Sequence, residues 1–194
     1  MDHAHTSGAV GVAAYDTTLR DGAQQQSVSF TVEDKLAVAR LLDALGVAYI
    51  EAGWPGAIPK DTELFCRVRD ELDLRTARLV AFGSTCRPGA AAAEDPQVRA
   101  LIDSGAPVIT IVAKSDPVHV ERALRTTREE NLRMVRETVG VLLAAGREVM
   151  VDLEHYFDGL GHDPGYGLQV ALTAARAGAG AVIACDTNGG TLPD

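Results

Sequence analysis

The chain of 194 residues is predicted to form the larger part of a (β/α)8 TIM barrel, an α/β fold. Short apolar runs, most of them rich in β-branched or small residues, alternate with amphipathic helical patterns. That alternation is typical of a parallel sheet with helical crossovers. Polar residues follow each apolar run, as expected where barrel strands end at one mouth. The competing open doubly wound sheet should show GxGxxG after its first strand, and this sequence lacks it.

The apolar runs are too short for typical helices, so each is interpreted as a strand. We expect an incomplete barrel of about six β/α units out of eight, whose first and sixth strands have unpaired edges. Residues 10–194 are then the N-terminal portion of the barrel, and residues 1–9, with His3 and His5, a disordered tail that binds no metal. The expected strands are residues 10–14, 48–52, 78–82, 108–112, 149–153 and 181–185.

Helix starts and stops are marked by capping residues and glycines. Thr31 is expected to cap a helix that Gly46 ends, and a long helix is expected from Asp116-Pro117 to Gly146. A third helix should run from Asp163-Pro164 to Gly178, and less regular helical patterns cover residues 60–72 and 95–104.

Composition restricts the classes of partner. The formal net charge of -9 argues against nucleic acid and against an anionic membrane surface. No apolar stretch approaches the length of a membrane span. The three cysteines show no CxxC spacing, which favours reduced thiols and a cytoplasmic location.

Arg20 and Asp21 follow the first apolar run, with Gly22 behind them. An aspartate at a barrel mouth can bind a divalent cation, and an adjacent guanidinium can polarise a carbonyl or stabilise an enolate. An ion pair that closes a surface loop explains the same two residues equally well.

Polar residues behind the later runs offer further candidates. Glu154 is a candidate acid–base group, or else a solvated loop carboxylate. Thr187 could orient a carboxylate substrate, although its DTNGG segment is also typical of an ordinary turn. His119, in the first turn of a helix, and His162, in a loop, are expected to be exposed rather than ligating. Trp54 is expected to be a rim or core aromatic residue, with a pocket wall as the alternative.

The segment DTTLRDGAQ, residues 16–24, resembles the D-x-T-L-R-D-G-x-Q signature of the acyl-CoA-condensing enzymes: isopropylmalate, homocitrate and citramalate synthases. The resemblance runs from about residue 15 to 193. Longer strings are similar to the citramalate synthase branch: FTVEDKL (30–36), YIEAGWPGAIPKD (49–61), FGSTCRPG (82–89), LRTTREENLRMV (124–135) and EHYFDG (154–159).

This resemblance implies a TIM barrel in which a divalent metal (Mg²⁺, Mn²⁺ or Zn²⁺) binds a 2-oxo acid. It implies condensation of acetyl-CoA with pyruvate to (R)-citramalate, in branched-chain amino-acid biosynthesis, by a homodimer. By motif, Asp21 is implied as a metal ligand, Arg20 faces the ketone or enolate oxygen, and Glu154 contacts the substrate. Thr187 is implied to hold the substrate carboxylate, and Gln24 belongs to the signature as a further substrate-binding residue.

The match departs from the family at two points. The remaining metal ligands of the family form an H-x-H pair on the seventh strand, beyond residue 194, so the metal is expected to be incompletely liganded in this chain. Ile109 stands where some relatives carry a histidine, which keeps isopropylmalate and homocitrate synthase as alternatives. A catalytically inactive fragment is the second alternative.

Overall fold

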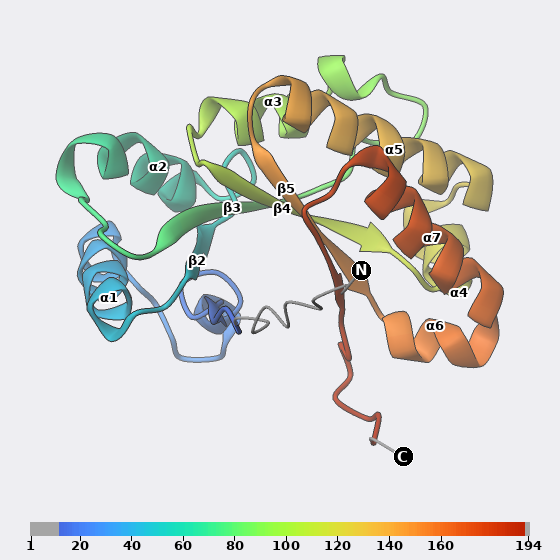
Figure 1. The fold of residues 1–194 in the computed structure, drawn as a ribbon, viewed down its shortest axis with the longest axis horizontal. Coiled ribbons are helices and arrows are strands. Elements are labelled where there is room, and N and C mark those ends of the chain that lie inside the picture. The colour runs from blue at the N-terminus through green and yellow to red at the C-terminus, as the bar shows by residue number, and fades with distance from the viewer. Residues whose placement is uncertain (1–11, 193–194) are drawn as a thin grey trace, which may run out of the picture.

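The computed structural model describes residues 12–192, in which six parallel strands form one sheet in the order of the chain. Figure 1 shows the sheet curving, with helices in an arc around its outer side. This confirms the predicted fold class, an incomplete TIM barrel. The predicted tail, with His3 and His5, lies outside the described residues. The strands are β1 (Tyr15–Asp16), β2 (Tyr49–Gly53), β3 (Arg78–Ser84), β4 (Val108–Lys114), β5 (Glu148–Glu154) and β6 (Ala181–Ala184).

Five strands lie within two residues of the predicted bounds, and the first does not. A strand was expected at residues 10–14, but residues 12–14 are irregular, and residues 10 and 11 lie outside the described part. The partner strand explains the shift: β2 begins at Tyr49, which is in register with Tyr15. Just before Tyr15, the Ala14 carbonyl still accepts from the Ala48 and Tyr49 amides, but the paired strand residues begin at Tyr15.

The helices that cover the sheet mostly have the predicted caps. Thr31 and Asp34 form a capping box, and Gly46 ends that helix in the left-handed region at φ 88°. Asp163 caps the last long helix, which Gly178 ends at φ 103°. No helix within residues 12–192 is long and apolar enough to cross a membrane. The α-helices are α1 (Val32–Leu45), α2 (Pro59–Glu71), α3 (Pro96–Asp103), α4 (Pro117–His119), α5 (Arg128–Ala144), α6 (Tyr156–His162) and α7 (Pro164–Ala177), with short turns η1 (Gly22–Gln24), η2 (Ala92–Glu94) and η3 (Val120–Leu124).

The predicted continuous helix from residue 117 to 146 was wrong. The segment begins as α4 and continues as the π-helical turn η3, and it breaks at Arg125, whose φ of 54° is left-handed. Thr127 then caps α5 by accepting a hydrogen bond from the Glu130 amide. A left-handed residue cannot continue a right-handed helix, so the periodicity spans two helices. His162 also ends α6, rather than lying in a loop.

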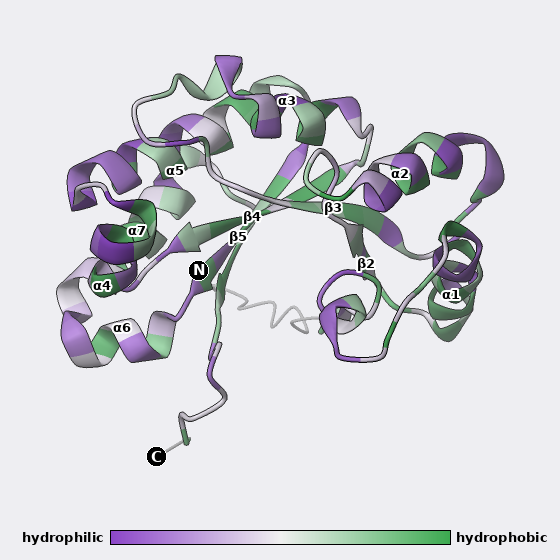
Figure 2. Ribbon diagram, turned by 180° about the vertical axis from the view of Figure 1, so that it is seen from behind, coloured by the Kyte–Doolittle hydropathy of each residue, from purple (hydrophilic) through white to green (hydrophobic). Residues whose placement is uncertain are grey.

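Side chains on the strands alternate between two environments. On β5, Val149, Val151 and Leu153 belong to the main core, which also holds the buried residues of the helices. Met150 belongs to a smaller cluster, with Tyr15 packed against it, so alternate β5 residues face the concave side. Figure 2 shows strands that are largely hydrophobic and helices that carry both kinds of residue. The concave face of the sheet is therefore where polar strand residues can meet.

Candidate active site

A cavity of about 320 Å³ opens at the carboxyl ends of the strands and brings together four of the five predicted site residues. Arg20 and Asp21 follow β1, Glu154 ends β5, and Thr187 follows β6. They meet because parallel strands direct their carboxyl ends to the same side of a barrel. The cavity is completed by Phe82, Val112, Asp152, Cys185 and Asp186.

Gln24, the fifth predicted residue, lies elsewhere. It ends the short turn η1, is exposed, and lines a separate cavity of about 130 Å³ beside Lys35 and Lys60. Arg20 lines both cavities. Gln24 thus shares a cavity with Arg20 but not with Glu154 or Thr187.

Arg20 is held from three directions. Its Nε donates to Glu51 Oε1 at 2.5 Å, and its Nη1 donates to Asp21 Oδ1 at 3.2 Å. Its guanidinium lies 3.8 Å from the centre of the Phe82 ring. The Arg20 side chain is only 13% exposed, whereas that of Asp21 is 62% exposed. The two interpretations of this pair are thus not exclusive: Arg20 and Asp21 form an ion pair, and both line the cavity.

Glu51, at the centre of β2, is a buried carboxylate that the sequence reasoning missed. It accepts hydrogen bonds from Arg20 and from the Tyr15 hydroxyl, which also lies 2.7 Å from Thr110 Oγ1. Burial raises the pKa of Glu51 although the Arg20 charge opposes the shift, and burial together with Glu51 raises the pKa of Tyr15. A glutamate inside the otherwise apolar run AYIEAG was the available signal.

Asp152 and Glu154 lie two positions apart on β5 and both line the cavity. Burial, and then the charge of Glu51, raise the pKa of Asp152 to about 7. A carboxylate in that range exchanges protons near neutral pH. Lys114, which is in register with Glu154 on β4, forms an ion pair with its carboxylate. Sequence reasoning missed Asp152 and Lys114; their alternation with apolar residues in VDLE and VAK was the signal.

Burial also determines the state of the thiol in the cavity. Cys185 lies behind β6, and burial, followed by the charge of Asp152, raises the pKa of its thiol to about 12. The thiolate is the nucleophilic form of cysteine. Cys185 is therefore a neutral wall residue at physiological pH.

Thr187 is oriented by a backbone contact. Its Oγ1 accepts a hydrogen bond from the His155 amide at 2.9 Å. A threonine hydroxyl has one donor hydrogen as well as its lone pairs, so the hydrogen of Thr187 stays free to donate. His155 has a left-handed φ of 54°, which is uncommon for a residue with a side chain. Its Nδ1 lies 3.0 Å from Asp158 Oδ2, and this contact lowers the pKa of Asp158, as does Asn188.

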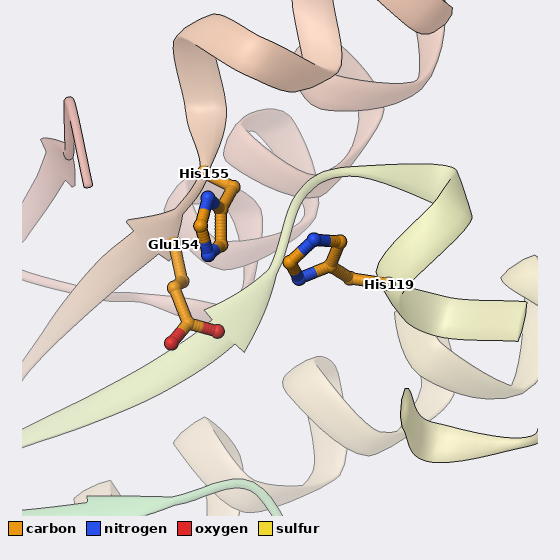
Figure 3. Close-up of side chains that lie close together, drawn as sticks. All are labelled: His119, Glu154 and His155. Carbon is orange, nitrogen blue, oxygen red and sulfur yellow. The ribbon is translucent and has the colours of Figure 1, made fainter. Parts of the chain in front are cut away.

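The rings of His119 and His155 lie beside the Glu154 carboxylate (Figure 3). One ligand atom from each of the three residues lies within 4.8 Å of the others. His119 was predicted to be exposed rather than ligating, but its side chain is 35% exposed and its ring centre is 4.2 Å from that of His155. The π-helical turn behind α4 and the left-handed His155 were not foreseeable from hydrophobic periodicity.

Asp21 does not belong to a group of this kind. Within residues 12–192, the one cluster of three or more histidine, cysteine or acidic side chains with converging ligand atoms is that of His119, Glu154 and His155. Asp21, the metal ligand that the resemblance implies, therefore has no group of converging ligands among the described residues.

Trp54 packs against Phe82, the ring on which the Arg20 guanidinium lies. It is half-buried, and its ring meets that of Phe82 edge-on at 5.2 Å. The sequence left open a rim or a core position, and the structure places this residue between the two.

The amino-acid sequence is similar to those of citramalate and isopropylmalate synthases. The chain is 62% identical over 179 residues to an (R)-citramalate synthase of Streptomyces coelicolor, covering 92% of this chain and 34% of that protein. It is 52% identical to the (R)-citramalate synthase of Aquifex aeolicus (94% and 34% covered) and 35% identical to a 2-isopropylmalate synthase of Synechococcus sp. (98% and 34% covered). The chain thus spans about a third of the length of these relatives.

Solved structures show the same fold at low identity. The HMG-CoA lyase of Bacillus subtilis superposes with a TM-score of 0.75 at 15% identity, covering 93% of this chain and 59% of the lyase. The hydroxymethylglutaryl-CoA lyase of Pseudomonas aeruginosa superposes with a TM-score of 0.71 at 21% identity and the same coverage. The family model described as HMGL-like matches residues 11–194. The strand order, the cavity at the strand ends and this match together establish that the chain belongs to the HMGL-like family.

Proposed function

We propose that the chain supplies the first six β/α units of an acyltransferase that condenses acetyl-CoA with pyruvate, giving (R)-citramalate and CoA. The observation that carries the proposal is the convergence of Arg20, Asp21, Glu154 and Thr187 on one cavity. The 62% identity to an (R)-citramalate synthase supports the choice of substrates. Because that relative is about three times as long, the activity is proposed for a longer protein, whose product would feed branched-chain amino-acid synthesis.

The reaction needs a base, a polarised ketone and a docked carboxylate. We assign Glu154 to take a proton from the acetyl methyl group, leaving an enolate whose carbon adds to the ketone carbon of pyruvate. Arg20 stabilises the negative charge that forms on the enolate or ketone oxygen. Its contacts with Glu51, Asp21 and Phe82 orient the guanidinium before the substrates bind. Water then cleaves the thioester, releasing CoA and the free carboxylate.

Thr187 is assigned to the pyruvate carboxylate. Its oxygen already accepts from the His155 amide, so its remaining hydrogen can point to an anionic substrate. The divalent ion of the family would polarise the ketone. Within residues 12–192, Asp21 is the one residue that the resemblance assigns to this ion.

The test uses a chain extended to the length of the relatives, with Mg²⁺ or Mn²⁺. Acetyl-CoA and each of several short 2-oxo acids are supplied, and free CoA is followed with a thiol reagent while the product is identified by chiral chromatography. We expect CoA release with pyruvate and (R)-citramalate as product. Preference for a branched 2-oxo acid would indicate an isopropylmalate synthase instead. No turnover with any short 2-oxo acid would refute the proposal.

A second candidate concerns the 194-residue chain alone, which we infer to be inactive without further chain. The observation in its favour is that Asp21 has no converging ligands within the described residues. The same assay, run side by side on the 194-residue chain and the extended chain, separates the two cases. Turnover by the shorter chain at a comparable rate would contradict this inference.

A further inference from the structure

All three histidines of the described region lie in one corner of the molecule. His119 is carried by α4, just behind β4, and His155 follows β5, while His162 ends α6. The strands β4 and β5 are neighbours in register, which is why residues 35 or more positions apart meet there. His162 Nδ1 lies 3.1 Å from the buried Asp116, so this ring has its own partner.

The other two rings face the Glu154 carboxylate. Their centres are 4.2 Å apart, and Figure 3 shows both beside the end of the glutamate side chain. The three ligand atoms lie within 4.8 Å of one another. In a tetrahedral zinc site, ligands about 2.0–2.1 Å from the ion are about 3.3 Å apart. Side-chain rotations would close this gap, since His119 and Glu154 are 35% and 28% exposed and have room to move.

Asp158 and Asn188 fix the orientation of the His155 ring. Asp158 Oδ2 lies 3.0 Å from Nδ1 of His155, and Asn188 Nδ2 in turn donates to Asp158 Oδ2 at 2.9 Å. A carboxylate on one ring nitrogen places the proton there and leaves Nε2 as a lone-pair donor, the arrangement found behind histidine ligands of zinc. The His155 amide is also held, through its bond to Thr187.

We propose that His119, Glu154 and His155 bind a zinc ion, at a site separate from Asp21. Two imidazole nitrogens and one carboxylate oxygen are a donor set of zinc sites that keep a fourth position for water. Mg²⁺ prefers oxygen ligands alone and is a poor candidate for this set. The proposal goes beyond the acyltransferase function and can be tested without it, because metal binding requires neither acetyl-CoA nor pyruvate. Glu154 is also the base assigned to the proposed condensation, so a zinc ion bound here would compete with that reaction.

Lys114 opposes the ion and so offers a diagnostic variant. Its ammonium group pairs with Oε2 of Glu154, so a bound cation would have to share or displace it. Replacing it by an uncharged side chain of similar length removes this competition. We therefore expect Lys114→Met to tighten zinc binding by about tenfold, because a like charge next to the ion is removed. A gain of affinity cannot result from loss of the fold.

The experiment is a titration of the 194-residue chain with Co²⁺ as a spectroscopic probe, followed by displacement with Zn²⁺. His3 and His5 are replaced by glutamine in every variant, so that the N-terminal H-x-H pair contributes no signal. We expect visible absorption typical of nitrogen-ligated cobalt, lost on addition of one equivalent of Zn²⁺. His119→Gln and His155→Gln should weaken binding by more than about 100-fold, and Asp158→Asn by about 10–100-fold.

His162→Gln is the control from the same corner, because it removes an imidazole that is not one of the three ligands; its partner Asp116 also lies 3.9 Å from His119 Nε2. Asp21→Asn tests the other metal position, and both variants should bind cobalt as the parent does. Circular dichroism spectra establish that each variant is folded. The proposal is overturned if the folded parent shows no cobalt band, if His162→Gln weakens binding as much as His119→Gln, or if only Asp21→Asn abolishes the signal.

Discussion

Acidic residues outnumber basic ones around the cavity, and Arg20 is the basic residue among those that line it. Asp21, Asp152 and Glu154 line the cavity, and Glu51 lies directly behind Arg20. Two of these acids, Glu51 and Asp152, have raised pKa values because burial disfavours their charged forms. In the proposed reaction, Arg20 would place its positive charge where an oxyanion forms, and its contacts with Glu51, Asp21 and Phe82 keep its orientation.

Arg20→Lys tests that role in the extended chain. A lysine cannot donate through a planar fork to Glu51 and Asp21 while lying on the Phe82 ring. We expect kcat/KM for pyruvate to fall by about 100- to 1,000-fold, as when one preorganised donor to an oxyanion is removed. Arg87→Lys is the control, since Arg87 is 71% exposed and lies outside the cavity. Activity of Arg20→Lys within a factor of two of the parent would count against the assignment.

At the scale of elements, a buried ion pair connects α1 and α2 to the end of β2. Lys35 pairs with Asp61 and also donates to the Ala52 carbonyl at 3.0 Å. Asp61 accepts from the Trp54 amide at 2.8 Å, and a Cβ on Gly53 would collide with its carboxylate. The pair thereby sets the path of the loop that carries Trp54, the neighbour of Phe82.

Lys35→Met leaves Asp61 buried without a counter-charge. Breaking one side of a buried ion pair typically costs about 3–5 kcal/mol, so we expect the free energy of unfolding to fall by that order. Urea unfolding followed by circular dichroism measures it. Lys60→Met, at an exposed position of α2 next to Asp61, should change stability by less than about 0.5 kcal/mol. Equal effects of the two substitutions on the free energy of unfolding would show that the buried ion pair stabilises the fold no more than an exposed lysine does.

Glu130 leads to a pH-dependent prediction at the start of α5. Its hydrogen bonds with Arg133, and then with the Gly89 amide, lower its pKa to about 2. A lowered pKa in the folded state means that the ionised group stabilises the fold above its ordinary pKa and that this contribution is lost as pH falls toward 2. Glu130→Gln should therefore destabilise the chain by about 1 kcal/mol at pH 7, after allowance for solvent screening.

The measurement is urea unfolding of parent and Glu130→Gln at pH 7 and again near pH 2.5. We expect the difference between the two proteins to shrink at the lower pH, where the carboxyl group begins to be protonated. Glu94→Gln is the control, at an exposed glutamate that makes no ion pair within residues 12–192. If the difference between parent and Glu130→Gln instead grew on acidification, the ionised Glu130 carboxylate would not be a stabilising group.

At the scale of the whole molecule, the open sheet leaves apolar surface at both ends. β1 and β6 are the outer strands of the described sheet. Leu41 and Leu45 on α1 are 70% and 79% exposed, and Leu168 and Leu172 on α7 are 52% and 41% exposed. In a closed barrel, further helices would cover these faces. Exposed apolar surface next to free strand edges favours association.

We therefore expect the 194-residue chain to self-associate at micromolar concentrations, as seen by light scattering after size exclusion. Leu45→Glu with Leu172→Glu should reduce the associated fraction several-fold, because each places a charge on one of the two apolar faces. Glu substitutions at Ala37 and Gln169, which are exposed on the same two helices, control for added charge alone. Association that these four substitutions leave unchanged would point to the strand edges instead.

The sequence alone determined the strand and helix order, most caps, and the positions of Arg20, Asp21, Glu154 and Thr187 at strand ends. These features depend on local patterning and on a short motif, which one linear stretch contains in full. Tertiary structure decided what those residues meet: Glu51 and Asp152 behind them, Lys114 on Glu154, and His119 beside His155. The contacts of Glu154 and Lys114 depend on the register of β4 and β5, and the position of His119 depends on the irregular backbone at residues 120–127. Hydrophobic periodicity predicts neither the register nor that backbone.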